Sequence, residues 1–81
     1  MSDASDKARR NAERRAANEA YWTLRAKQAA RARDLDRAMF CRAMADCWHW
    51  LSGGDKDAAR DYQREAVAHL RAMKREPAHA R

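Results

Sequence analysis

The chain has almost no residues that interrupt a helix: glycine occurs only at Gly53 and Gly54, and proline only at Pro77. Alanine, arginine, glutamate and leucine, which favour helices, fill much of the stretch before Gly53. The sequence therefore predicts an all-α protein in which residues 1–81 form one small helical domain.

Long apolar runs are also missing. The longest uninterrupted one spans residues 38–41, far short of the roughly 20 residues that cross a bilayer as a helix. Residues 1–20 lack the apolar segment of a secretory signal, and their four acidic residues argue against a transit peptide. We therefore expect a cytoplasmic protein with no membrane partner.

Signatures of catalytic or metal chemistry are absent as well. The sequence contains neither a Cys-x-x-Cys nor a His-x-x-x-His pair, which argues against a metal site, and its two glycines lack the spacing of a phosphate-binding loop. Cys41 and Cys47 point about 120° apart on one predicted helix, which argues against a disulfide. We expect a protein that is not an enzyme and binds no cofactor, metal or small-molecule substrate.

The glycine pair predicts a tight turn between two helices. It supplies the left-handed residue that commonly closes a helix C-terminus. Asp55 is placed to cap a second helix over residues 56–76, which Pro77 ends. Because the turn is short, the sequence predicts an antiparallel helical hairpin, with its core over residues 33–76 and a frayed tail over 77–81.

One apolar stripe on each arm predicts the hairpin core. The stripes comprise Phe40, Cys41, Met44, Cys47, Trp48 and Leu51 on the first arm, and Ala59, Tyr62, Ala66, Leu70 and Met73 on the second. Folding about Gly53 pairs residues whose numbers sum to about 107, for example Cys41 with Ala66. Much of the 46% apolar content is alanine, which buries little area, so this core is small and help from a partner is expected.

The first arm continues well upstream of this core, and the sequence leaves two arrangements open. The arm can break near Asp34, where Asp34 or Asp36 would cap a new helix, and fold back to form a three-helix bundle. It can also stay helical and pack against a second copy. Residues 1–20 carry alanines and charges but almost no large apolar side chain, so we expect a charged, mobile arm there.

A second apolar face on the first arm predicts a contact beyond the hairpin. On one continuous helix this face lies opposite the stripe that contains Met44. The expected partner or dimer interface comprises Tyr21, Trp22, Leu24, Leu35, Met39 and Trp50. Tryptophan and tyrosine are common at interface hot spots. The sequence thus indicates a protein that docks on a protein partner, on a second copy as a homodimer, or on both. By analogy with other small helical proteins, we expect a regulator or inhibitor of a larger assembly, of the kind that phages and mobile elements carry.

The alternative function is that of a nucleic-acid-binding accessory protein. Eighteen basic residues against twelve acidic ones leave a net charge of +6, which favours nucleic acid or an acidic protein as partner. The candidate contacts are Arg25, Lys27, Arg31, Arg33 and Arg37. These residues do not share one face of a helix, and only Gln28 lies among them to read base edges, so protein docking is the primary prediction.

Overall fold

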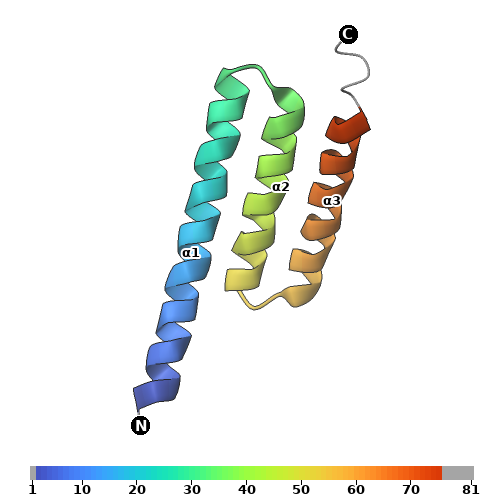
Figure 1. The fold of residues 1–81 in the computed structure, drawn as a ribbon. Coiled ribbons are helices and arrows are strands. Elements are labelled where there is room, and N and C mark those ends of the chain that lie inside the picture. The colour runs from blue at the N-terminus through green and yellow to red at the C-terminus, as the bar shows by residue number, and fades with distance from the viewer. Residues whose placement is uncertain (1, 76–81) are drawn as a thin grey trace.

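The computed structural model describes the backbone of residues 2–75 and the side chains of residues 3–74. Three helices follow one another: α1 (Ser2–Arg31), α2 (Leu35–Ser52) and α3 (Lys56–Arg75), with no strand in the part described (Figure 1). Each helix runs antiparallel to the next. The predicted all-α fold is confirmed, and so is the arrangement in which the arm breaks near residue 34 and folds back. The predicted helix end at residue 76 and the tail over 77–81 lie outside the described residues.

The turn between α1 and α2 is closed without a glycine. Arg33 takes the left-handed conformation, with φ of 61°. The N–H groups of Arg33 and Asp34 donate to the carbonyls of Ala30 and Ala29 at 3.0 and 2.9 Å. This pair of hydrogen bonds is a Schellman motif, which satisfies the last carbonyls of a helix. Of the two capping residues predicted, Asp34 is the N-cap of α2, since its carboxylate accepts the N–H of Arg37 at 3.2 Å.

The turn between α2 and α3 has the same geometry built on glycine. Gly54 is left-handed, with φ of 87°, whereas Gly53 stays right-handed at −79°. The Asp55 N–H donates to the Trp50 carbonyl at 3.0 Å, and the Asp55 carboxylate accepts the N–H of Ala58 at 3.0 Å. The predicted glycine turn, the Asp55 cap and the antiparallel hairpin are therefore all confirmed.

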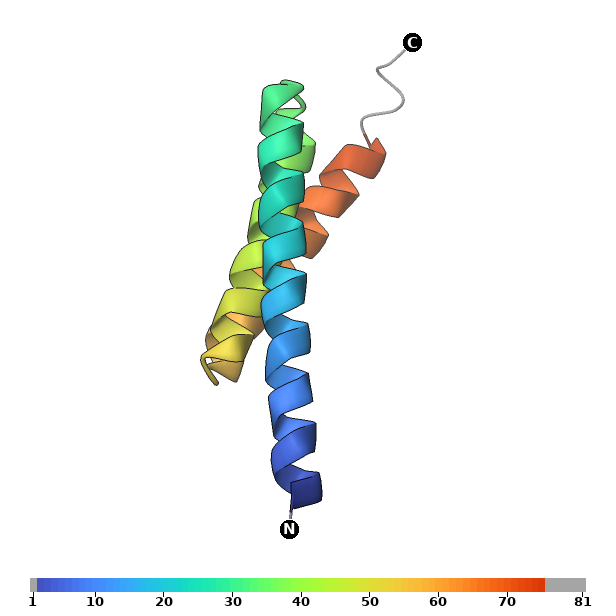
Figure 2. The ribbon, with the colours of Figure 1, turned by 90° about the vertical axis from the view of Figure 1, so that its left-hand side faces the viewer.

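The three helices lie in a row and do not close around a common core. α2 is the middle helix and packs against both neighbours, whereas α1 and α3 do not touch along their described lengths. The molecule measures 59 × 24 × 15 Å, so its smallest dimension is little more than the diameter of one helix. The radius of gyration is 15.3 Å, against about 12 Å for a globular domain of this length. Seen from the side, α3 is inclined to the other two helices (Figure 2). The described helices leave both broad faces of the layer uncovered.

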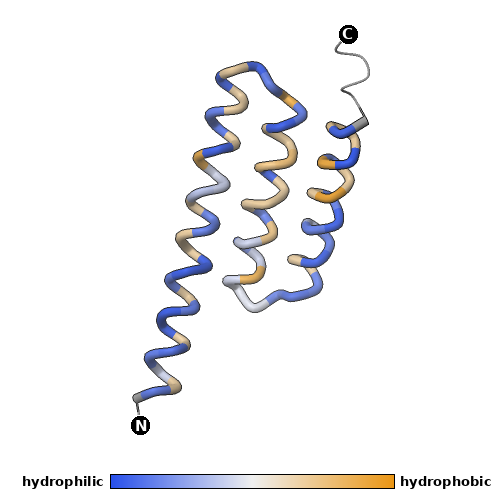
Figure 3. Tube along the Cα trace, in the orientation of Figure 1, coloured by the Kyte–Doolittle hydropathy of each residue, from blue (hydrophilic) through white to orange (hydrophobic). Residues whose placement is uncertain are grey.

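Small residues form the two seams between the helices. The buried residues are Ala29, Cys41, Ala43, Ala45, Ala59 and Ala66. No large side chain among the described residues is fully buried. The chain exposes 6386 Å², against about 5,000 Å² for a folded monomer of its 9.4 kDa mass. The most apolar positions lie mainly on α2 and α3, while α1 is largely hydrophilic (Figure 3). Large apolar side chains are thus left on the broad faces of the layer.

α1 continues past the end of α2 as an isolated helix (Figure 1). Its 30 residues span about 45 Å, whereas the 18 residues of α2 span about 27 Å. The segment predicted as a charged arm is helical from residue 2 to residue 20, and its Arg9 guanidinium lies 3.5 Å from the Asp6 carboxylate. None of the helices in the described part of the chain combines the length and the apolar character that a membrane crossing needs.

Candidate docking face

A groove between α2 and α3 holds most of the large apolar side chains of the hairpin. We call it the apolar groove. Its volume is about 410 Å³, and it is lined by Phe40, Met44, Cys47, Trp48 and Leu51 from α2 and by Gln63, Ala66, Val67 and Leu70 from α3. On each helix these positions recur at steps of one, three or four residues, the spacing that places side chains on one face. Phe40 and Val67 both line the groove. Their residue numbers sum to 107, as the predicted hairpin pairing requires.

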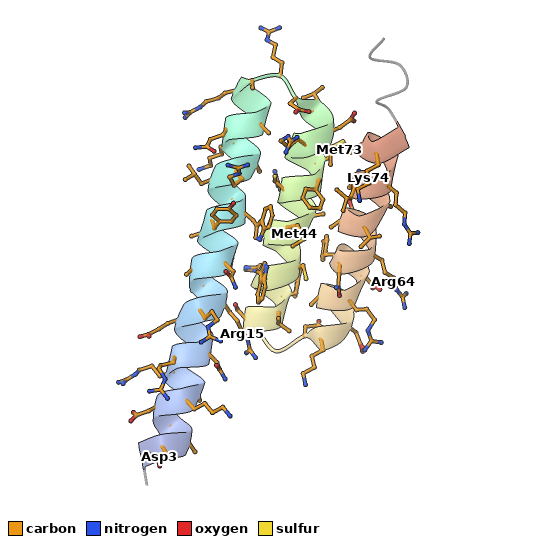
Figure 4. All side chains as sticks on the ribbon, viewed as in Figure 1. Asp3, Arg15, Met44, Arg64, Met73 and Lys74 are labelled. Atoms are coloured by element: carbon orange, nitrogen blue, oxygen red, sulfur yellow. The ribbon has the colours of Figure 1, made fainter. Side chains whose placement is uncertain are left out.

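Two shallower hollows adjoin the apolar groove, one on each side. The first lies toward α1, shares Trp48 and Leu51 with the groove, and is completed by Asn11, Arg14 and Arg15. The second lies on α3, shares Gln63 and Val67 with the groove, and is completed by Arg64, Ala68 and Arg71. We call the groove and these two hollows together the docking face. Arg15, Met44 and Arg64 follow one another across the three helices in Figure 4.

The charge on this face has one sign. The described part of the chain places four arginines on the two outer hollows and no carboxylate on any of the three. The centre carries apolar and aromatic side chains and a single amide. An apolar centre with a charged rim is the usual anatomy of a protein interface, and arginine and tryptophan are the residue types most frequent at its hot spots. The face is therefore suited to an apolar partner with acidic margins.

The other side of the α2 and α3 pair has a different character. Its hollow has a volume of about 350 Å³ and is lined by Leu35, Ala38, Met39, Arg42, Ala43, Asp46, Glu65 and His69. On α2, Leu35 is nine residues from Met44, which turns it about 180° away. Acidic and basic groups are mixed here, and the His69 ring lies 3.7 Å from the Glu65 carboxylate. We call this the opposite groove.

The six residues predicted as one interface do not share a surface in the structure. Leu35 and Met39 line the opposite groove. Trp22 is half-buried and packs edge-on against Phe40, with ring centroids 5.7 Å apart, so it adjoins the docking face from α1. Tyr21 packs edge-on against Trp22 at 5.1 Å and remains 51% exposed.

The remaining two predicted residues are exposed as well. Leu24 lies on α1, turned about 140° from the buried Ala29, and Trp50 lies near the end of α2 beside His49. The prediction placed these residues together because it treated residues 21–50 as one straight helix. The turn after Arg31 reverses the chain. Angular positions on a helical wheel therefore cannot be compared between residues before and after this turn.

The hairpin stripe also needs one correction. Cys41 was assigned to the core between the last two helices, but it faces the α1 side, where Arg25 is close enough to influence its thiol. Trp48 likewise reaches toward α1, because it lines both the apolar groove and the hollow that contains Arg14. The physical reason is that α2 is a middle helix with two seams, so its apolar positions are divided between two neighbours.

The five predicted nucleic-acid contacts are dispersed. Arg25 and Arg37 line a notch of about 280 Å³ at the turn between α1 and α2. The Arg37 side chain is paired with the Asp34 carboxylate at 3.2 Å, and the Arg25 guanidinium lies 5.9 Å from the centre of the Tyr21 ring. The other three are exposed, Lys27 and Arg31 on α1 and Arg33 in the turn. They do not form a continuous basic stripe.

Neither thiol is an activated nucleophile. Burial raises the pKa of the Cys41 thiol above its ordinary value, although the charges of Arg25 and Arg37 oppose that rise. Burial also raises the pKa of the Cys47 thiol. Both cysteines are free, and at neutral pH both are protonated. Cys47 lines the apolar groove, where a protonated thiol contributes apolar surface.

Both histidines in the described part of the chain lie beside a carboxylate. His49 Nδ1 lies 3.2 Å from Glu19 Oε2, which links α2 to α1 across their seam. Within residues 3–74, no three His, Cys, Asp or Glu side chains gather closely enough to hold a metal ion. What the described structure presents is thus an apolar surface with a basic rim.

Sequence reasoning missed the four arginines of the docking face and the groove residues Gln63 and Val67. Arg64 and Arg71 flank Val67 at three and four residues, a spacing that marks one face of a helix. Arg14 and Arg15 carried no such signal, because their place beside Trp48 depends on the fold-back of α1.

No protein-family model matches this chain, and neither a curated protein nor a solved structure shows significant similarity to it.

Proposed function

We propose that this protein acts without enzymatic activity, by docking on a partner protein through the docking face, as a regulator or inhibitor of a larger assembly. The observation that carries the proposal is the apolar groove of about 410 Å³, which the described part of the chain leaves uncovered. Exposed apolar area of this kind in a water-soluble fold is stabilised when a partner covers it. Six of its nine lining residues are large and apolar or aromatic: Phe40, Met44, Trp48, Leu51, Val67 and Leu70.

The face fits a protein better than a nucleic acid. Phosphate-binding surfaces concentrate basic groups along one stripe, and base readout uses hydrogen-bonding side chains. Here the apolar groove separates the arginines of α1 from those of α3. A duplex laid across the face would desolvate Met44 and Leu51 without supplying apolar contacts for them.

The test uses a photo-crosslinking amino acid placed in the full-length chain inside cells that carry its gene. Position 67 lies in the apolar groove, and position 24 is the matched control, an exposed apolar position on α1 away from the groove. We expect position 67 to give a covalent adduct with a protein of defined mass, and position 24 to give none. A protein adduct of twice the chain mass identifies a second copy as the partner and supports docking.

Three results would contradict the proposal: no adduct from either position, equal adducts from both, or an adduct with nucleic acid alone. Each is read by mass spectrometry after the sample is treated with protease or nuclease. Strong binding of random duplex DNA that falls steeply with rising salt would support the nucleic-acid alternative instead.

A further inference from the structure

We infer that the occupant of the apolar groove is one amphipathic helix of a different protein, about three turns long, with aspartate or glutamate on both sides of its apolar stripe. The inference rests on the proposed docking function and specifies the partner. Its basis is the combination of groove shape, groove length and rim charge.

The shape of the groove favours a helix. It is concave and runs between two antiparallel helices, α2 and α3, so it can receive the ridge of side chains that a third helix presents. In a closed bundle a third helix occupies this place, but α1 lies on the far side of α2. A guest helix would therefore complete a three-helix core that the three described helices leave open.

The length of the groove sets the length of the guest. From Phe40 to Leu51 the groove follows eleven residue steps of α2, which is about 16 Å or three helical turns. A guest of that length presents apolar anchors at positions i, i+3 or i+4, and i+7, the usual pattern of a helix bound in a groove.

The rim charge sets the polar residues of the guest. Arg14 and Arg15 lie beyond one edge of the groove, and Arg64 and Arg71 lie beyond the other. All but Arg15 are exposed, and no hydrogen bond or ion pair engages these four side chains within the described residues. A helix with carboxylates flanking its apolar stripe would meet positive charge at both edges, which assists encounter and fixes orientation.

A second copy of this chain fits the groove less well. A symmetric face-to-face dimer would bring the four arginines of one copy against the four of the other, and like charges across an interface oppose association. The opposite groove of another copy is itself concave and cannot fill this one. A lipid surface is also a poor match, because Met44, Trp48 and Leu51 are half-buried along a concave surface and do not protrude.

The experiment selects binders of the full-length chain from a displayed library of helical 18-residue peptides with randomised surface positions. Binding of each enriched peptide to the Val67→Glu variant is measured after the selection. Val67 is 38% exposed, glutamate is the better helix former, and a glutamate there lies three and four residues from Arg64 and Arg71, so this variant is expected to fold. Circular dichroism confirms that it does.

We expect enrichment of peptides with apolar residues at i, i+3 or i+4, and i+7, flanked by aspartate and glutamate. An enriched peptide should bind the Val67→Glu variant at least about tenfold more weakly than the original chain. The inference is overturned if no peptide is enriched, if the enriched flanks are neutral or basic, or if binding is equal for both proteins.

Charge reversal tests the rim separately. The double variant Arg64→Glu and Arg71→Glu should bind the acidic peptide about tenfold or more weakly than the original chain does. It should prefer a peptide with lysine at the same flanking positions. The control is Lys27→Glu and Arg31→Glu, which reverses the same number of charges at exposed positions on the outer side of α1, each turned about 160° from the buried Ala29. If both double variants behave alike, the rim does not select the partner, and the inference is wrong.

Failure of the helical-partner inference can be distinguished from failure of the proposed docking function. If the library yields nothing, but light scattering shows a dimer that Val67→Glu dissociates, the docking function stands and a second copy occupies the groove. Vesicles of phosphatidylcholine with phosphatidylglycerol, or duplex DNA, provide the other arms. Suppose that no peptide is enriched, and that the chain binds vesicles or duplex DNA in a way that Val67→Glu abolishes. The inference of a helical partner is then overturned.

Discussion

Replacing Arg33 with glycine should stabilise the protein, because Arg33 is the one described non-glycine residue held in the left-handed conformation. A residue with a Cβ atom pays roughly 1 to 2 kcal/mol in that conformation, whereas glycine costs about 0.5 to 1 kcal/mol through the greater freedom of the unfolded chain. The difference is a gain of roughly 0.5 to 1 kcal/mol. The Arg33 side chain is exposed and lines none of the hollows of the docking face, so little is lost with it.

Thermal unfolding followed by circular dichroism measures this gain. For a domain of this size the Tm of the Arg33→Gly variant should rise by about 2 to 8 °C. The matched control is Arg33→Ala, which removes the same side chain but keeps the Cβ atom, and its Tm should stay close to the original. A glycine variant no more stable than the alanine variant would show that the left-handed turn at Arg33 carries no strain, and the account of how α1 ends would be wrong.

Three further predictions concern the cap and the thiols. Asp34→Ala should lower the unfolding free energy by about 1 kcal/mol, because it removes the N-cap of α2, while Asp36→Ala should change it much less; equal losses would contradict the assigned cap. Burial raises the pKa of Cys41 and Cys47 in the folded state. At high pH the folded protein therefore binds more protons than the unfolded protein. The free energy of unfolding should then fall as pH rises above the ordinary thiol pKa of 9.0. This slope should be shallower in the double Cys→Ala variant, as measured by urea unfolding at pH 8 and at pH 10. Iodoacetamide should alkylate Cys47 before Cys41, as followed by mass spectrometry. A peptide bound in the apolar groove should slow the alkylation of Cys47. An unchanged rate of Cys47 labelling in the saturated complex would show that the peptide binds elsewhere.

The fold was predictable from the sequence where glycine marks a turn. Gly54 and Asp55 define the turn between α2 and α3 by residue type alone, and the antiparallel hairpin follows from their short spacing. The turn between α1 and α2 has no such marker, because Arg33 takes the position that glycine usually holds. Only the possible capping carboxylates of Asp34 and Asp36 signalled it, and that signal could not distinguish a fold-back from an extended helix.

The candidate site was less predictable, because its composition depends on which helices lie side by side. Periodicity found most apolar positions of the groove, including Phe40, Met44 and Leu51, but it assigned them to an interior. Helical periodicity identifies an apolar face and cannot say whether a neighbouring helix covers it. Once the first arm breaks, α1 lies beside α2 and not over the hairpin, so the predicted core is left as an open groove.

The alanine content of the chain explains both the flat layer and the exposed groove. Alanine and cysteine fill the two seams: Ala43 and Ala45 lie on nearly opposite sides of α2, and Ala43 is on the α3 side, where it lines a hollow with Glu65 and His69. Such seams place helix axes close together, but they bury little apolar area and therefore contribute little stability. The large side chains are displaced from the seams to the broad faces, where they remain half-buried or exposed. A partner at one hundred times its Kd would stabilise the fold by about 2.7 kcal/mol, a large fraction of the stability of a domain this small. The alanine seams thus give a physical reason why the fold would gain stability from the partner that we propose for the apolar groove.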